Sequence, residues 1–241
     1  LSIGAVTGRN KVFLLNDAEK NAANIDGVDV RPVVSRRRQI AGITLTKLDL
    51  QTLAANGQKT WLLTPHELTK SVQEYLKIVP EKDLENVVWF KKRTPWWKVQ
   101  LASHYDAVFT YMNDLGPRLV RLESGIVCTN TLHRVQFKKT ASDCEKISAL
   151  LSPISTFGQL AAEKIGRAYS GGVLKFELAE AKKLPIVRSE KFNEELIKRV
   201  DELLRKDDAA NATAAVDEAF MTELFGSTWH EAQAKLRVEL A

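Results

Sequence analysis

Short apolar runs of the kind that form strands recur through the first three quarters of the chain. Residues 4–8 (GAVTG) and 11–15 (KVFLL) predict two strands joined by a turn at residues 8–10. Residues 29–35 (DVRPVVS) predict an extended segment that Pro32 restricts to an edge strand or a loop. Further short strands are expected at residues 86–90 (NVVWF), 108–112 (VFTYM), 118–122 (RLVRL) and 125–137 (GIVCTNTLHRVQF).

Helical patterns alternate with these runs. The segment 60–80 starts as a strand and continues as a helix, because Thr64, Pro65 and Glu67 supply an N-cap, a first-turn proline and a capping box. Apolar residues at helical spacing and a second capping box at Ser142 indicate that helices also follow the strands of the middle region. Those helices are predicted over residues 142–151 and about 156–169.

From about residue 190 only helical patterns remain. Apolar residues recur at helical spacing over residues 192–203. A small-residue break at 207–215 follows, and after it come two more helices, one that ends at Gly226 and one that is capped by Thr228. We therefore place a boundary near 188–191, between a first domain of residues 1–189 and a helical region of residues 190–241. The fold class expected is α+β: a mixed or antiparallel sheet with several helices, followed by a small helical C-terminal region.

Charge is distributed unevenly along the chain. Residues 1–190 hold 28 lysines and arginines against 19 acidic residues, whereas residues 191–241 hold 7 against 11. The body of the chain therefore carries a net charge of +9 and the tail −4, within a total of +5. A basic body indicates a polyanionic partner, with nucleic acid as the first candidate.

Three motifs concentrate this positive charge. Residues 89–99 (WFKKRTPWWKV) place three tryptophans beside four cations, which suits contact with bases and phosphates, or else a core anchored by Trp96 and Trp97. The run at 35–39 (SRRRQ) suits contact with phosphates or a base edge, or else a solvated loop. Residues 133–139 (HRVQFKK) alternate as a strand does and would present a basic face.

The stretch 165–176 (IGRAYSGGVLKF) joins a predicted helix to a predicted strand through two glycines. A phosphate-cradling loop has its glycines between a strand and a following helix, which is the opposite order. One interpretation is a glycine C-cap after Tyr169. The other is a piece of a nucleic-acid-binding surface.

Several other classes of site find no support in the sequence. Cys128 and Cys144 lie too far apart for a paired metal-binding motif, and two reduced thiols are favoured over a disulfide framework. The four histidines have no metal-ligand spacing and no nucleophile motif is present, so no catalytic centre is expected within this chain. No apolar run approaches 18 residues, so no membrane partner is expected.

An ordered series of motifs runs through about residues 3–187. It consists of GAVTGRNKVF, YLKIVP, KKRTPWWKV, PRLVRL, CTNTLHRV, GRAYSGGVLKF and AKKLPIV. In order and spacing the series resembles the C-terminal target-recognition region of the N6-adenine-specific DNA methyltransferases of bacterial restriction–modification systems. GRAYSGGVLKF resembles that family's Gly-Arg-x-Tyr-Gly-Gly-Gly-Val-Leu block, with Ser170 in place of one glycine.

The resemblance implies a DNA-binding domain that positions duplex DNA for methylation of adenine N6 by a separate catalytic domain. The family's Asn-Pro-Pro-Tyr/Phe motif and its glycine-rich S-adenosylmethionine loop do not occur in this sequence. This chain is therefore expected to bind no cofactor and to methylate nothing alone, and S-adenosylmethionine is implied only for the full-length enzyme. The expected partners are double-stranded DNA and the catalytic domain, on the same polypeptide or on a partner chain, in the cytoplasm. The alternative is a protein–protein docking or specificity subunit without direct base readout.

The side chains expected to contact DNA are cations, aromatic residues and one amide from these motifs. They are Arg9, Asn10, Arg36, Arg37, Arg38, Lys91, Lys92, Arg93, Trp96, Trp97, Arg134, Lys138, Arg167, Tyr169 and Lys175.

Overall fold

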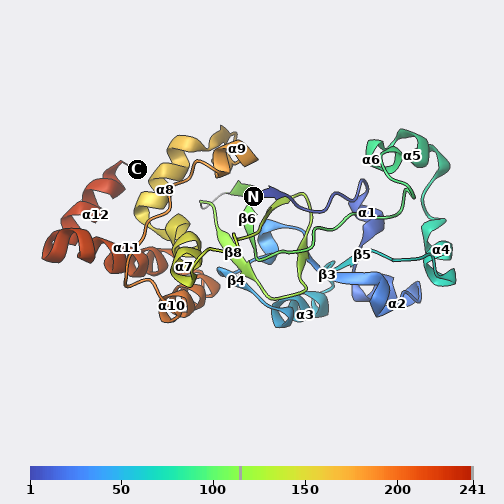
Figure 1. Cartoon of the computed structure of the whole chain (residues 1–241), viewed down its shortest axis with the longest axis horizontal. Helices are drawn as coiled ribbons and strands as arrows, with labels where there is room; N and C mark the ends of the chain where they lie inside the picture. Colours follow the sequence, from blue (N-terminus) through green and yellow to red (C-terminus); the bar gives the residue numbers. More distant parts are fainter. Residues whose placement is uncertain (114–115, 240–241) are drawn as a thin grey trace.

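A five-stranded mixed sheet occupies the middle of the molecule (Figure 1). The computed structural model that describes it covers residues 1–113 and 116–239. Four strands pair antiparallel, and the fifth runs parallel to its neighbour. In sheet order the strands are β1 (Ser2–Ile3), β10 (Leu132–Val135), β6 (Ala107–Thr110), β8 (Leu119–Leu122) and β4 (Thr44–Leu45).

Two smaller sheets hold the other strands of the described residues. One has four strands in the order β2 (Leu14–Leu15), β5 (Trp61–Leu63), β3 (Val30–Val34) and β9 (Val127–Cys128). The other has three strands in the order β11 (Arg167–Tyr169), β12 (Val173–Lys175) and β7 (Met112–Asn113). Helices precede and follow the strands along the chain, and the sheets contain parallel as well as antiparallel pairs. This arrangement confirms the expected α+β class.

Helices cover the two ends of the molecule (Figure 1). No helix in the described part of the chain is long and apolar enough to cross a lipid bilayer. The α-helices are α1 (Asn10–Phe13), α2 (Asp17–Ala22), α3 (Lys47–Ala55), α4 (Lys70–Leu76), α5 (Glu81–Asn86), α6 (Val88–Lys91), α7 (Asp143–Leu151), α8 (Thr156–Ile165), α9 (Leu178–Ala181), α10 (Glu194–Arg205), α11 (Ala209–Phe225) and α12 (Trp229–Val238). Short 3-10 turns are η1 (Gly27–Asp29), η2 (Arg37–Gln39), η3 (Ser152–Ile154) and η4 (Gly226–Thr228).

The strand predicted at residues 11–15 is wrong in its first half, which forms α1. Four consecutive residues, from Val12 to Leu15, are all buried. A strand sends alternate side chains to opposite faces, whereas a helical turn followed by the short strand β2 directs all four into one core. Of the strand predicted at residues 4–8, the structure has only a bridge between Ala5 and Thr129.

The strand predicted at residues 86–90 is also wrong, because this segment ends α5 and forms α6. Phe90 is buried, but Val88 and Trp89 are 54% and 44% exposed. The apolar run predicts a buried strand, but of its side chains Phe90 is buried in the core and Val87 packs against it half-buried.

Two predicted element boundaries differ from those in the structure. The helix expected from Pro65 begins at Lys70, because Thr69 rather than Thr64 supplies the cap by accepting a hydrogen bond from the Val72 amide (3.3 Å). The single strand expected over 125–137 is divided into β9 and β10, which belong to different sheets.

The C-terminal helices share a core with the central sheet. Phe109 and Leu119 of the sheet belong to one apolar cluster with Ile197, Val200 and Val216 of α10 and α11. Residues on both sides of the predicted boundary therefore bury each other, and the division at 189–190 stays a prediction.

Asp201 of α10 ties this helical end to the sheet. Its Oδ1 accepts hydrogen bonds from the backbone amides of Ile43 and Thr44, both at 2.7 Å, and its Oδ2 accepts from Nε of Arg205 at 2.5 Å. The approach requires Gly42, where a Cβ would lie 2.1 Å from Oδ1 of Asp201. The start of β4 is thus fixed by a buried carboxylate more than 150 residues away in sequence.

We predict that Asp201→Ala lowers the free energy of unfolding by about 3 kcal/mol, because it leaves two backbone amides and Nε of Arg205 without their acceptor. Urea denaturation measures the change. Glu202→Ala, at the exposed next position of the same helix, serves as the control and should change stability by less than about 0.5 kcal/mol. Equal effects of the two substitutions would contradict the role given to Asp201.

Candidate nucleic-acid interface

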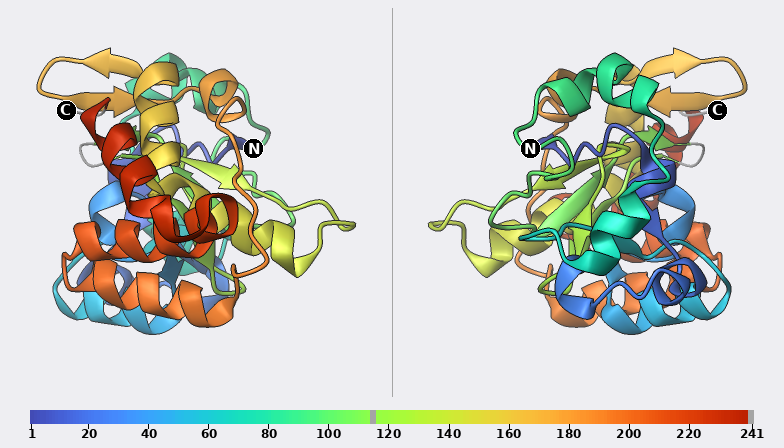
Figure 2. Two further views of the ribbon diagram at one scale, coloured as in Figure 1. Left: turned by 90° about the vertical axis from the view of Figure 1, so that its left-hand side faces the viewer. Right: turned by 90° about the vertical axis from the view of Figure 1, so that its right-hand side faces the viewer.

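Strands β11 and β12 form a hairpin that projects from one side of the molecule (Figure 2). Its turn consists of residues 170–172, in which Gly171 and Gly172 have φ of +82° and +76°. These angles favour glycine, and no atom would lie within 4 Å of a Cβ at either position, so the tip is open to solvent. The glycines interpreted as a possible helix C-cap instead form the tip of a hairpin.

Helix α8 ends at Ile165, before the predicted end at Tyr169. The reason is Gly166, where a Cβ would lie 2.9 Å both from the carbonyl oxygen of Ala162 and from Cζ of Phe176. The backbone at Gly166 leaves the helix with φ −66° and ψ 155° and enters β11 directly. Close packing against an aromatic ring therefore decides where the hairpin starts.

Three predicted contact residues lie on one face of the hairpin. Arg167 pairs with Lys175 and Tyr169 with Val173, so these four side chains point to the same side. Leu174 points to the other side and is buried in the core. The pattern of Arg167, Tyr169 and Lys175 in the sequence corresponds to one physical surface.

Acidic neighbours neutralise both cations of this face. Nζ of Lys175 lies 2.8 Å from Oε1 of Glu177 and also packs over the rings of Tyr111 (5.1 Å) and Tyr169 (5.4 Å). The hydrogen bond to Glu177 raises the pKa of Lys175, and the same bond lowers the pKa of Glu177. Arg167 pairs with Glu180 at 2.7 Å. These pairs stiffen the hairpin and leave Tyr169, 49% exposed, as its accessible polar contact.

The base of the hairpin is held by His133. Its Nε2 donates a hydrogen bond to the carbonyl oxygen of Phe176 (2.7 Å), and its ring stacks on Phe109 at 6.4 Å between centroids. Because β12 also pairs with β7, the hairpin has fixed contacts to the body of the molecule on two sides.

A hollow of about 580 Å³ lies between this small sheet and the turn η2. We call it the arginine groove. Four arginines and one acidic residue line it, so its charge is positive. It is formed by Arg37, Arg38, Ile40, Ala41, Met112, Asn113, Arg118, Val173, Leu204, Arg205 and Asp207.

Gln39 positions the arginine turn. Its buried Oε1 accepts hydrogen bonds from the amides of Ser35 (2.8 Å) and Arg36 (3.0 Å), while its Nε2 donates to the carbonyl oxygen of Lys59 (3.1 Å). Arg36 and Arg38 are consequently exposed, and Arg37 is half-buried with Nη1 donating to the Ile40 carbonyl oxygen (2.9 Å). The two outer arginines are therefore presented to solvent from a braced turn.

Arg118 is a residue of the groove that sequence reasoning missed. It is buried, and its Nη1 donates to the carbonyl oxygen of Ala41 at 2.5 Å. Arg118 thereby braces the wall that carries Arg37 and Arg38. A single arginine in an ordinary strand pattern gives no sequence signal for this role.

A second hollow, of about 260 Å³, lies beside β1 and α6. We call it the tryptophan pocket. Three predicted contact residues, Lys92, Arg93 and Arg134, line it together with Trp89 and Tyr105. Its remaining lining residues are Ser2, Ile3, Gly4, Ala5, Val6, Gln100 and Ala102.

The tryptophans predicted as contacts are structural. Trp96 packs its ring against Phe13 and Phe90, at 6.4 and 5.1 Å between centroids, and Trp97 is half-buried against the same cluster. Trp89, absent from the predicted set, is the exposed member of the motif, with Nζ of Lys92 5.2 Å from its ring centroid. The core interpretation of Trp96 and Trp97 is thus the one their packing supports.

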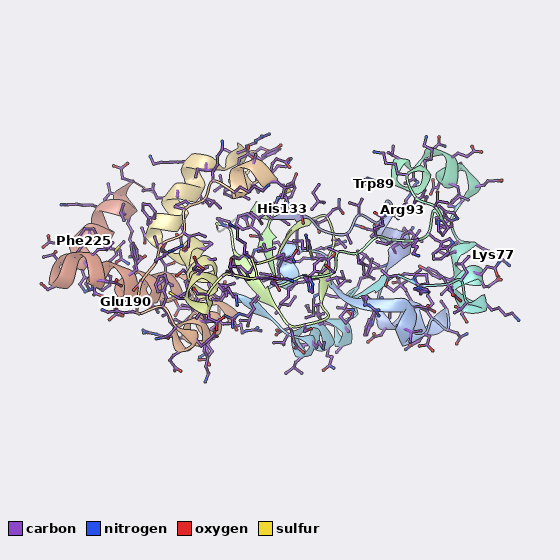
Figure 3. All side chains as sticks on the ribbon, viewed as in Figure 1. Lys77, Trp89, Arg93, His133, Glu190 and Phe225 are labelled. Carbon is purple, nitrogen blue, oxygen red and sulfur yellow. The ribbon has the colours of Figure 1, made fainter. Side chains whose placement is uncertain are left out.

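Arg93 is structural as well. Its guanidinium donates to the carbonyl oxygens of Val6 and Thr7, the latter at 3.1 Å. Arg93 follows the end of α6 and lies near Trp89 (Figure 3), so its bonds hold the segment after β1 against this end of the helix. Arg134 has a mixed role, since it donates to Ser2 Oγ (2.9 Å) and to the His104 carbonyl oxygen (2.7 Å) while remaining half-exposed.

The remaining predicted residues lie apart from both hollows. Arg9 pairs with Asp83 at 2.5 Å, and Oδ1 of Asn10 accepts a hydrogen bond from Thr7 at 2.5 Å. Lys91 is exposed on α6. Lys138 is on the segment between β10 and α7, which projects from the side opposite the hairpin (Figure 2).

The fifteen predicted residues therefore do not form one surface. Arg37 and Arg38 gather in the arginine groove beside the hairpin, and Lys92, Arg93 and Arg134 gather in the tryptophan pocket. Their contact with DNA stays a prediction. Within the described residues no group of three histidine, cysteine, aspartate or glutamate side chains could hold a metal ion.

The chain is similar to known restriction-modification proteins both in sequence and in fold. The family model of the C-terminal domain of the Type II methyltransferase M.Eco57I matches residues 1–221. Among solved structures, the chain is similar to the Type IIL restriction-modification enzyme MmeI in complex with DNA, with a TM-score of 0.54 and 12% sequence identity. That similarity covers 98% of this chain and 35% of the MmeI chain, so this chain spans about a third of its length.

We predict that Arg93→Ala lowers the free energy of unfolding by about 2 kcal/mol, because the backbone carbonyl oxygens of Val6 and Thr7 lose a charged donor. Lys92→Ala is the matched control at the exposed neighbouring position and should change it by less than about 0.5 kcal/mol. Chemical denaturation of both variants checks the difference. A stable Arg93→Ala variant would return Arg93 to the list of free contact residues.

Proposed function

This chain belongs to the family of C-terminal domains of Type II methyltransferases represented by M.Eco57I, and we propose that it recognises duplex DNA for the methyltransferase of a restriction–modification system. The observation that carries the proposal is the arginine groove. Arg36 and Arg38 are exposed at a turn braced by Gln39, and Arg38 lines the groove together with Met112, Asn113 and Val173 of the hairpin sheet. Cations on a braced turn can contact the phosphates of a duplex, and a hairpin that projects beside them can contact one of its grooves.

The arginine turn and the hairpin have different roles in this recognition. Exposed guanidinium groups neutralise phosphates, or bind the O6 and N7 acceptors of guanine in a bidentate manner. The hairpin has its own cations already paired with Glu177 and Glu180, so it contributes shape and the Tyr169 hydroxyl rather than free charge. Phosphate contacts of the turn would set the register in which the hairpin meets a groove.

Chemistry is assigned to a domain outside this sequence. In the proposal, a catalytic methyltransferase domain on the same polypeptide or a partner chain extrudes the target adenine and transfers a methyl group from S-adenosylmethionine to N6. The residues described here would hold the duplex in place, which accords with the MmeI enzyme having been solved on DNA. The site of action would be the cytoplasm.

A docking function remains the second candidate, favoured by apolar residues on the helical end. Leu224 and Phe225 at the end of α11 are 64% and 48% exposed, and Val238 of α12 is 76% exposed. Exposed apolar residues of this kind suit contact with another protein domain. Phe225 lies at the far end of the molecule from Trp89 (Figure 3), so contact with another domain at Phe225 would not cover the surface around Trp89.

We predict that the chain binds duplex DNA with an affinity that falls steeply with salt, by about 0.9 decades per decade of salt for each phosphate neutralised. Arg36→Ala and Arg38→Ala should each weaken binding by about 1 to 3 kcal/mol at fixed salt. Fluorescence anisotropy across a salt series measures both. A substitution that acts on a base should change sequence preference, whereas one that acts on a phosphate should weaken all sequences alike.

Arg199→Ala is the control for this experiment. Arg199 is exposed on α10, beside the acidic Glu202 and Glu218, and outside the arginine groove. It should leave DNA affinity nearly unchanged. Binding that ignores salt, or equal losses for Arg38→Ala and Arg199→Ala, would contradict the proposal and leave docking as the better account.

A further inference from the structure

We propose that the tryptophan pocket binds a nucleobase that lies outside a base stack, with its ring against Trp89 and its phosphate beside Lys92. The proposal deepens the proposed function, since it rests on DNA as the partner of this chain. It assigns a role to Trp89, an exposed aromatic side chain that the arginine groove and the hairpin do not use.

The packing of α6 holds the side chain of Trp89 at the surface, where it is 44% exposed. Its neighbour Phe90 is 1% exposed and packs edge-on against Phe13 and at an interplanar angle of 51° against Trp96, which fixes the rotation of α6 about its axis. Gly8 lies under the helix, and a Cβ there would be 3.0 Å from Cε1 of Phe90 and 3.2 Å from Cβ of Trp89. Because α6 is anchored on this side, Trp89 must face outward and cannot fold back into the core.

The charge of the pocket suits a phosphate. Among the described residues, Lys92, Arg93 and Arg134 are its charged lining residues, and none that lines it is acidic. Lys92 has no carboxylate partner among the ion pairs of the described residues, unlike Lys175 and Arg167 of the hairpin. Arg93 and Arg134 already donate hydrogen bonds to oxygen atoms of the protein. Lys92 is therefore the cation of the pocket that can bind a phosphate without giving up such a bond.

The walls of the pocket offer a second aromatic ring and polar edges. Tyr105 lies under the guanidinium of Arg134 at 5.6 Å, and Ser2 and Gln100 add a hydroxyl and an amide for the edge of a base. Arg93 keeps the wall rigid through its bonds to Val6 and Thr7. Aromatic faces with neighbouring cations are how proteins bind bases that are not stacked in a duplex.

The size of the pocket favours one base over a duplex. Its volume of about 260 Å³ is below the range of 300–1,000 Å³ that is usual for drug-sized ligands. The hollow of about 820 Å³ that contains Lys138 differs in charge, because it also contains Asp106, Asp143 and Glu194. The arginine groove is positive as well, but the described residues that line it include no aromatic side chain. Charge, aromatic faces and size thus select the tryptophan pocket among the described hollows.

The test compares three DNAs of one sequence: a fully paired duplex, the same duplex with one bulged 2-aminopurine, and the single strand. Anisotropy gives the affinity, and 2-aminopurine fluorescence reports stacking. We expect the wild-type chain to prefer the bulged duplex. Trp89→Ala should remove this preference, with a loss of roughly 5- to 150-fold on the bulged duplex and little change on the paired one. Trp89→Phe should retain most of it.

Val88→Ala is the matched control, since Val88 is similarly exposed on the same helix but does not line the pocket. Lys92→Ala should weaken binding to every DNA and reduce the salt slope by about 1. Single strands that bind as tightly as the bulged duplex, with the same dependence on Trp89, would identify the single strand as the source of the base and support the pocket.

Two outcomes would overturn the inference: a wild-type chain that binds bulged and paired duplexes equally, or a Trp89→Ala variant that keeps the preference and the quenching of 2-aminopurine. Either leaves salt-dependent binding of the paired duplex intact, so the proposed function would stand. Absence of binding to any duplex would instead remove the proposed function itself.

Discussion

The carboxylate of Asp201 is the contact on which the geometry of the candidate interface depends. It accepts hydrogen bonds from the backbone amides of Ile43 and Thr44 at the start of β4, and from Nε of Arg205 on its own helix. The arginine turn lies only a few residues before these amides, and Arg205 itself lines the arginine groove. One buried acid therefore fixes the helical end, the edge of the central sheet and one wall of the groove together.

The cations of this chain fall into two physical classes. Arg9, Arg167, Lys175 and Arg205 are held by carboxylates within 2.8 Å and shape the fold. Exposed cations such as Arg36, Arg38 and Lys92 have no such restraint among the described ion pairs. Net charge in the sequence counts both classes equally, although only the second can exchange counterions for phosphates without cost to the fold.

Sequence reasoning was most successful where a local pattern decides the structure. Short apolar runs predicted β6 and β8, and the capping box at Ser142 predicted α7, with Glu145 donating its amide to Ser142 Oγ at 3.2 Å. It failed where a distant contact decides the outcome. Gly166 ends α8 because Phe176 packs against it, and no pattern in residues 156–169 contains that information.

The same division applies to the site. Arg36, Arg37 and Arg38 are conspicuous in the sequence, and the motif at 167–175 does form one surface. The exposed tryptophan could not be selected from three candidates, because the contact of Trp96 with Phe13 and Phe90 exists only in the folded chain. Arg118 gave no signal, since its role depends on the carbonyl of Ala41, 77 residues away in sequence.

Amide hydrogen exchange with and without a duplex tests the central claim most directly, because it locates the contact on the folded chain without substitutions. The account predicts slower exchange on DNA in residues 36–41 and at the hairpin tip, residues 170–172, whose amides lie on the proposed interface. Unchanged exchange in both segments, with protection confined to α10, α11 and α12 or to residues 136–142, would contradict it.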